Sequence, residues 1–114
     1  MKKRAYERIS VDMKTDFFWS DQLNVGAVAN LSENGLLVRT DVCPPLRAKF
    51  DLNLPVEGDV LKIPVKVRRL VENDQDTEAI GVEILDPSEE YLNFVSTLRW
   101  NQIKGQRQPD SAPQ

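Results

Sequence analysis

The feature that most constrains this fold is a period-two alternation of apolar and polar residues in the middle of the chain. Every second residue is apolar in three segments: 49–54, 61–67 and 80–84. A β-strand points successive side chains to opposite sides of a sheet, so each segment has one face to bury and one to expose to water. The pattern is typical of an antiparallel sheet with one solvated side.

Three earlier segments are also predicted to be strands: 9–19, 24–29 and 36–40. Polar loops separate the later strands at 55–59 and 72–78. Pro64 lies inside one strand and predicts a sheet edge or a bulge there, because proline donates no hydrogen bond to a neighbouring strand. About six short strands at close intervals favour a small closed barrel, which leaves no exposed sheet edge.

The last segment changes to a helical pattern. Asp86-Pro87-Ser88-Glu89 resembles a helix start, with Asp86 as the N-cap. Apolar residues then recur at helical spacing over 91–98, as expected of a helix that packs on the sheet or plugs a barrel end. Gly105 is expected to end the helix, and residues 105–114, which hold no large apolar side chain, are predicted to be a disordered tail. The predicted fold is therefore mainly β, a six-stranded antiparallel β-barrel with a C-terminal α-helix.

Length and composition limit what this fold can do. The chain of 114 residues allows one domain, which we assign to residues 1–104. No apolar run approaches the roughly 20 residues of a membrane span, and no apolar stretch follows the basic N-terminus as in a signal peptide. With Cys43 as the single cysteine, we expect a cytoplasmic protein without membrane insertion.

Histidine is absent, which removes the usual general base and the commonest metal ligand. We therefore expect no enzyme, no catalytic residue and no metal site, and favour a binding or signalling module.

The charge is unevenly distributed. The net charge of −3 opposes binding of a nucleic acid polymer. Residues 1–8, however, carry Lys2, Lys3, Arg4 and Arg8 against Glu7 alone, a balance of 4 − 1 = +3. A basic N-terminal arm on an acidic body suits a small anionic ligand.

Two short patterns could bind such a ligand. Arg4 and Arg8 lie four residues apart, and a guanidinium is a planar donor fork that pairs with phosphate or with the edge of guanine. Judged alone, the pair is better explained as a solvated basic terminus. In Asn30-x-Ser32-x-x-Gly35, an extended backbone would turn Asn30 and Ser32 to the same side, and Gly35 would permit positive φ or a close ligand. An Asx-type turn that closes a hairpin explains this second pattern equally well.

Together and in this order, the two patterns resemble the PilZ domain family, bacterial receptors for the second messenger cyclic di-GMP. The resemblance runs from about Lys3 to the helix near Trp100. Segment 80–84 also resembles a late strand of that family. The resemblance implies a six-stranded antiparallel barrel with a C-terminal helix, which agrees with the fold predicted from the alternation.

The resemblance also implies a set of ligand-binding residues and roles for them. Arg4 and Arg8 would clamp guanine and phosphate groups, Asn30 and Ser32 would hydrogen-bond the ligand, and Gly35 would shape the turn. An extra cation, Lys3, would reach a further phosphate. Strand alternation points Arg68 and Arg69 to opposite sides, so at most one of them is expected to face the ligand.

The resemblance implies a receptor or adaptor that binds cyclic di-GMP as its ligand, uses no cofactor and signals to an unknown effector protein. Two alternatives stay open. A PilZ-like adaptor could work through protein contacts without nucleotide. A small barrel could bind single-stranded nucleic acid, although such proteins interleave aromatic and basic residues on one strand face, and here the apolar positions lie opposite the charged ones.

Overall fold

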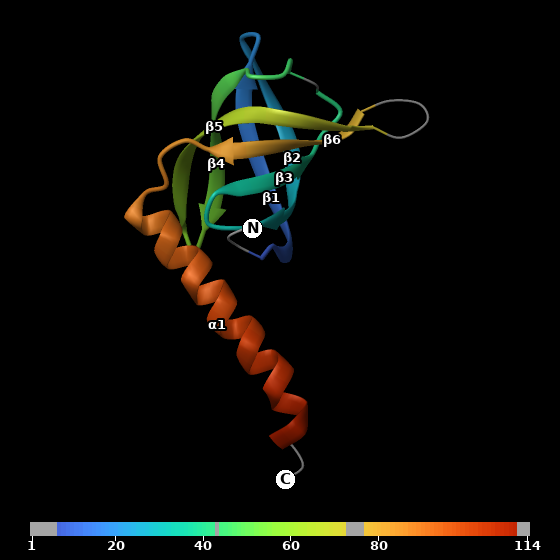
Figure 1. Ribbon diagram of the computed structural model, residues 1–114. Coiled ribbons are helices and arrows are strands. Elements are labelled where there is room, and N and C mark those ends of the chain that lie inside the picture. The colour runs from blue at the N-terminus through green and yellow to red at the C-terminus, as the bar shows by residue number, and fades with distance from the viewer. Residues whose placement is uncertain (1–6, 43, 73–76, 112–114) are drawn as a thin grey trace, which may run out of the picture.

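A computed structural model describes residues 7–42, 44–72 and 77–111 as a β-barrel followed by one helix (Figure 1). The elements are β1 (Ile9–Trp19), β2 (Gln22–Leu31), β3 (Gly35–Arg39), β4 (Lys49–Val56), β5 (Asp59–Glu72), β6 (Thr77–Ile84) and α1 (Glu89–Ser111). The six strands pair in an antiparallel manner and close the barrel in the order β1-β2-β3-β6-β5-β4. The predicted fold class is confirmed, and each predicted strand segment lies in an observed strand, with Thr40 just beyond the end of β3.

The alternation in the later strands produces the barrel interior. Eight of their apolar residues are at most 4% exposed: Leu52, Leu54, Ile63, Val65, Val67, Ile80, Val82 and Ile84. Phe50 and Leu61, at the outer ends of their segments, are partly buried and pack against this core. The barrel closes where β1 meets β4, through the pairs Asp16–Asn53 and Phe17–Leu52. Side chains reinforce this short ladder, since the Asn53 amide donates to the Asp16 carboxylate over 2.8 Å. Thus the residues with period two form one core, as predicted.

Pro64 lies just before the point where the pairing of β5 with β6 begins. It is opposite Asp51 of β4, whereas β6 pairs with β5 only from Val65 onward. The missing N–H therefore leaves no gap in the β5–β6 ladder, and the Pro64 carbonyl still accepts a hydrogen bond from the Leu85 N–H over 2.9 Å. The expectation of an edge strand or of a bulge at this proline is therefore wrong, since β5 pairs with β4 and with β6 and the proline is placed where the β6 pairing begins. The predicted loop at 72–78 lies only partly within the described residues, with Glu72 and Thr77 paired at its ends.

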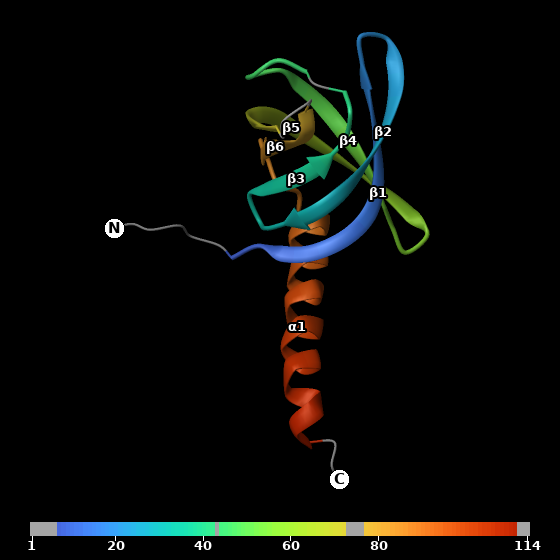
Figure 2. The same cartoon turned by 90° about the vertical axis from the view of Figure 1, so that its right-hand side faces the viewer.

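The helix closes one end of the barrel and then projects away from it (Figure 2). Tyr91 and Val95 are fully buried and belong to the barrel core, so the prediction of a helix that plugs the barrel end is confirmed. The N-cap is Ser88 and not Asp86, because the Ser88 hydroxyl accepts the Tyr91 N–H over 3.1 Å. A serine hydroxyl three residues before an unpaired backbone N–H can accept a hydrogen bond from it, whereas Asp86 lies too far before Tyr91 in the chain to do so.

The predicted helix end at Gly105 is wrong. Helix α1 continues to Ser111, so the predicted tail of 105–114 is helical as far as that residue. A glycine ends a helix only where it takes a left-handed conformation, and within a helix it costs about 1 kcal/mol relative to alanine without stopping it. Residues 112–114 lie outside the described part of the chain.

Candidate functional site

A polar hollow of about 290 Å³ lies on the outside of the barrel, between the start of β1, the β2–β3 turn and the strands β5 and β6. Its lining residues are Arg8, Asn34, Gly35, Arg68, Arg69, Gly81, Val82 and Glu83. Three guanidinium groups therefore face one hollow that holds a single carboxylate. Such a surface attracts anions with planar acceptor edges, because each guanidinium presents a flat fork of N–H donors.

One residue from each sequence pattern lines the hollow, Arg8 and Gly35, and a third pattern residue, Asn30, contacts Arg8. Arg8 precedes β1, which pairs with β2 so that Ser10 lies opposite Asn30. As a result the Arg8 Nη1 group donates to the Asn30 Oδ1 atom over 2.9 Å. Gly35 lies beside them, and a Cβ atom added to it would be 3.4 Å from the Arg8 Nη2 group and 3.0 Å from a backbone carbonyl. The tighter of the two contacts is with the Val82 carbonyl, so Gly35 chiefly lets the start of β3 approach β6 closely.

Ser32 takes a different role from the one expected of an extended strand. Strand β2 ends at Leu31, and Ser32 is 1% exposed. Its hydroxyl donates to Asn34 Oδ1 over 2.8 Å and accepts the Asn34 N–H over 3.3 Å. The Ser32 N–H also donates to the Gly35 carbonyl over 2.8 Å. The expectation that Asn30 and Ser32 face the same side is therefore wrong, because the chain leaves the strand between them, and the turn alternative describes Ser32 better.

Two β-bulges direct polar side chains toward this region. The pairing of β2 with β3 shifts between Val28 and Asn30, and that of β5 with β6 shifts between Val67 and Arg69. An extra residue in a strand reverses the phase of alternation from that point. Asn30 therefore points outward although Val28, two residues earlier, is fully buried.

The bulge in β5 overturns the expectation that Arg68 and Arg69 point to opposite sides. Both are exposed and both line the hollow. The sequence contains a sign of this bulge. Simple alternation places apolar residues two positions apart, whereas Val67 and the next core-facing apolar residue, Leu70, are three positions apart. Arg68 pairs with Glu83 over 3.5 Å while their side chains remain 62% and 44% exposed, so the pair is weak and both groups stay accessible.

Helix α1 contacts both edges of this site through Arg99. Its guanidinium binds the Glu33 carboxylate with two hydrogen bonds, from Nε over 2.8 Å and from Nη2 over 2.6 Å. The Nη2 group also donates to the Glu7 carbonyl over 2.6 Å, next to Arg8. The hydrogen bonding between Arg99 and Glu33 lowers the pKa of Glu33 and raises the pKa of Arg99, although partial burial opposes both shifts. The helix is thus linked to the β2–β3 turn and to the chain just before β1.

A second link from the helix is fully buried. The Tyr91 hydroxyl donates to the Ser32 carbonyl over 2.6 Å. Burial raises the pKa of the Tyr91 phenol above its ordinary value, and the nearby Glu33 carboxylate raises it further. The phenol therefore stays protonated and holds the β2–β3 turn in place through this hydrogen bond. The sequence patterns identified neither Tyr91 nor Arg99, since their partners are 59 and 66 positions away.

Two of the predicted ligand-binding residues, Lys3 and Arg4, lie outside the described residues. Within the described residues, no cluster of three or more acidic or cysteine side chains is arranged to hold a metal ion. Over the same part of the chain, no helix has the length and apolar character needed to cross a membrane.

Comparison with known proteins agrees with this fold. Residues 2–98 match the family model described as the PilZ domain. A search of the curated proteins found no significant match. Among solved structures, the chain is similar to the Bacillus subtilis inhibitor of motility MotI/DgrA, with 13% identity and a TM-score of 0.75 over 91% of this chain and 53% of that one.

Two structures from Escherichia coli are also similar. YcgR in complex with c-di-GMP has 14% identity and a TM-score of 0.78 over 99% of this chain and 51% of that one. The PilZ domain of YcgR with c-di-GMP has 14% identity and a TM-score of 0.69 over 97% of this chain and 99% of that one. The chain therefore spans about half the length of MotI/DgrA and of full YcgR, and nearly all of the isolated YcgR domain.

Proposed function

We propose, because this chain belongs to the PilZ domain family, that it is a cytoplasmic receptor for cyclic di-GMP that signals to a partner protein without catalysing a reaction. The observation that carries the proposal is the contact between Arg8 and Asn30 at the rim of a hollow lined by Arg68 and Arg69. The solved E. coli relatives hold c-di-GMP on the same fold.

The chemistry of the hollow suits the ligand. Cyclic di-GMP carries two phosphates and two guanines, and guanidinium groups pair with both. Asn30 is a neutral acceptor, so it fixes the direction of the Arg8 guanidinium without adding a negative charge beside it. Arg8 is therefore oriented before the ligand arrives, which lowers the entropic cost of binding.

The remaining motif residues would complete the site. We assign Arg4 to a second guanine or phosphate contact and Lys3 to a further phosphate, in keeping with the resemblance. Gly35 lines the hollow and would leave room for the ligand beside the backbone. Ser32 would act through the turn that its hydroxyl and Asn34 hold in shape.

The route from the ligand to a partner would run through helix α1. A ligand bound by Arg8 would lie next to the Glu7 carbonyl, which accepts a hydrogen bond from Arg99. Arg99 also holds Glu33 inside the Asn30–Gly35 motif. A change in either contact alters how α1 is fixed to the barrel, and with it the surface that a partner meets.

Titration calorimetry with cyclic di-GMP tests the proposal. Arg8→Ala should weaken binding about tenfold to a hundredfold, since a charge-assisted hydrogen bond contributes about 1.5–3 kcal/mol. Arg39→Ala is the matched control, because Arg39 is exposed at the far end of β3 and lines no part of the hollow. Equal affinity of the Arg8→Ala and Arg39→Ala variants would refute the role of Arg8. No binding by the unaltered protein would instead favour the adaptor that works without nucleotide.

A further inference from the structure

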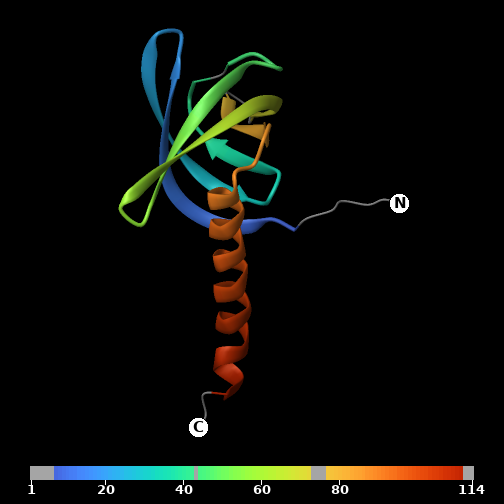
Figure 3. The ribbon, with the colours of Figure 1, turned by 90° about the vertical axis from the view of Figure 1, so that its left-hand side faces the viewer.

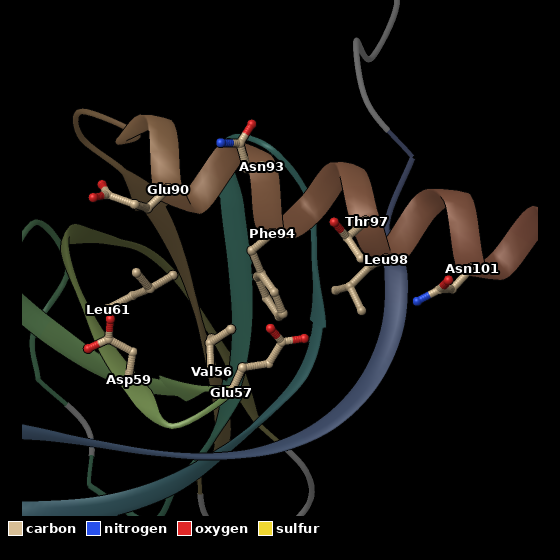
Figure 4. Close-up of a pocket in the computed structure, with 10 residues that line it drawn as sticks. All are labelled: Val56, Glu57, Asp59, Leu61, Glu90, Asn93, Phe94, Thr97, Leu98 and Asn101. Carbon is tan, nitrogen blue, oxygen red and sulfur yellow. The ribbon is translucent and has the colours of Figure 1, made fainter.

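A second and larger hollow, of about 420 Å³, lies between helix α1 and the hairpin of β4 and β5. In Figure 3 the tip of that hairpin lies beside the first turns of the helix, and Figure 4 shows side chains from the two elements facing each other across the groove. It shares no residue with the guanidinium-lined hollow. We call it the helix–hairpin groove.

The floor of the groove is apolar. Val56 and Leu61 from the hairpin and Phe94 and Leu98 from the helix line it. All four are only partly buried, and they pack against the barrel core with one side while the other faces the groove (Figure 4). A partner side chain that covered these surfaces would remove apolar area from water, which stabilises association.

The rim of the groove is acidic. Glu57 and Asp59 lie on the hairpin and Glu90 lies on the helix, so carboxylates stand on both sides (Figure 4). No lysine or arginine is among the described residues that line the groove, and none of the three carboxylates forms an ion pair with another described residue. The three charges therefore repel one another mildly and attract a cation from outside.

Both walls are held in place before anything binds. The hairpin turns through Glu57 and Gly58 alone, with φ values of 52° and 83°, which is the tight two-residue turn that matches strand twist. Opposite it, Tyr91 and Val95 fix the helix in the core. A preformed groove loses little conformational entropy on binding.

We propose that the helix–hairpin groove is the docking site for a basic amphipathic segment of a partner protein, which places apolar side chains on the floor and lysine or arginine on the acidic rim. Charge complementarity selects this occupant, since an acidic segment would meet like charges on both walls. Asn93, Thr97 and Asn101 recur every four residues along the helix wall and offer hydrogen bonds to the polar face of that segment. This proposal describes the kind of partner that the receptor proposed above would bind. The residues that support it are separate from those of the guanidinium-lined hollow.

The test uses the full chain and fluorescence anisotropy of a labelled peptide of about 12 residues, with lysine and leucine at helical spacing. We expect it to bind more tightly than a lysine–serine peptide of equal charge, and a glutamate–leucine peptide not to bind. The groove variant carries Glu57→Gln, Asp59→Asn and Glu90→Gln and should weaken binding about tenfold, as expected for the loss of three exposed ion pairs. A control variant neutralises three exposed carboxylates elsewhere, Asp12→Asn, Asp41→Asn and Asp51→Asn, for the same change in net charge.

Equal weakening in the groove and control variants would overturn the proposal, because the attraction would then be non-specific. NMR shift changes should map to the β4–β5 turn and the groove side of α1, and a map centred on another surface would also overturn it. Dimerisation that the groove variant abolishes in sedimentation would assign the groove to a second copy of this chain instead. Calorimetry with cyclic di-GMP on the same variants keeps this test separate from the receptor proposal, since the groove variant should bind the nucleotide unchanged.

Discussion

The contact between Arg99 and Glu33 is expected to fix helix α1 to the β2–β3 turn with a measurable coupling energy. The two hydrogen bonds are 2.8 and 2.6 Å long, and the side chains are only 27% and 21% exposed. Exposed ion pairs contribute about 0.2–1 kcal/mol, whereas bidentate charge-assisted pairs shielded from water contribute more. A partly shielded pair of this geometry should therefore give about 1.5 kcal/mol of coupling between the two residues.

Urea unfolding of the single variants Arg99→Met and Glu33→Gln and of the double variant measures that energy as a double-mutant cycle. The Arg68–Glu83 pair is the internal control, because it is 3.5 Å long with side chains 62% and 44% exposed, and its coupling should stay below about 0.5 kcal/mol. Coupling for Arg99 and Glu33 no larger than that of the control pair would refute the reasoning from shielding and geometry.

The same pair predicts a dependence on pH. Because Arg99 lowers the pKa of Glu33 in the folded protein, the unfolded chain binds a proton at this group more readily than the folded one. The contribution to stability is therefore fully present above the unfolded pKa of about 4.5 and is lost as the pH falls through the folded pKa. In Glu33→Gln this part of the acid dependence of unfolding should disappear, as urea titrations at a series of acidic pH values can show.

Three smaller predictions concern stability, each measured by thermal or urea unfolding. Tyr91→Phe should cost about 1–2 kcal/mol, because the buried Ser32 carbonyl loses its 2.6 Å donor. Gly26→Ala should cost about 1–3 kcal/mol, since the new Cβ would be 2.7 Å from the Arg39 carbonyl oxygen. Gly58→Ala should cost about 1 kcal/mol for a different reason, since nothing crowds it and only its positive φ resists a side chain.

The barrel was predictable because its signal is local. In β4 and β6 each residue's side follows from its place in a period of two, and the buried residues Leu52, Leu54, Ile80 and Val82 obey it. The helix was predictable for the same reason, since the spacing of Tyr91 and Val95 is enough to select its buried face. These predictions need only the geometry of a single element.

The site was less predictable because it depends on interruptions of that geometry and on distant partners. Asn30 and Arg69 point outward only because an extra residue precedes each of them in its strand. Ser32 leaves the expected surface because β2 ends at Leu31. Arg99 meets Glu33 only once the helix has been placed against the barrel, and strand periodicity carries no information about that placement.

The bulge in β5 can be tested directly, because one deletion removes it. Deleting Arg68 leaves Val67, Arg69 and Leu70 in simple alternation, with Arg69 still opposite Gly81 and Leu70 still opposite Ile80. The pairing of β5 with β4 ends at Lys66, before the deleted position. The shortened protein should therefore fold with an intact core.

The deletion and Arg68→Ala remove the same guanidinium, and only the deletion also removes the extra twist that a bulge gives a strand. If that twist directs Arg69 into the hollow, the deletion variant should bind cyclic di-GMP more weakly than the Arg68→Ala variant does. We expect a difference of about tenfold in calorimetry, because the deletion variant loses one further charged contact. Thermal unfolding of both variants controls for damage to the fold. Equal affinities in two well-folded variants would mean that the bulge does not direct Arg69, and that Arg68 acts only through its charge.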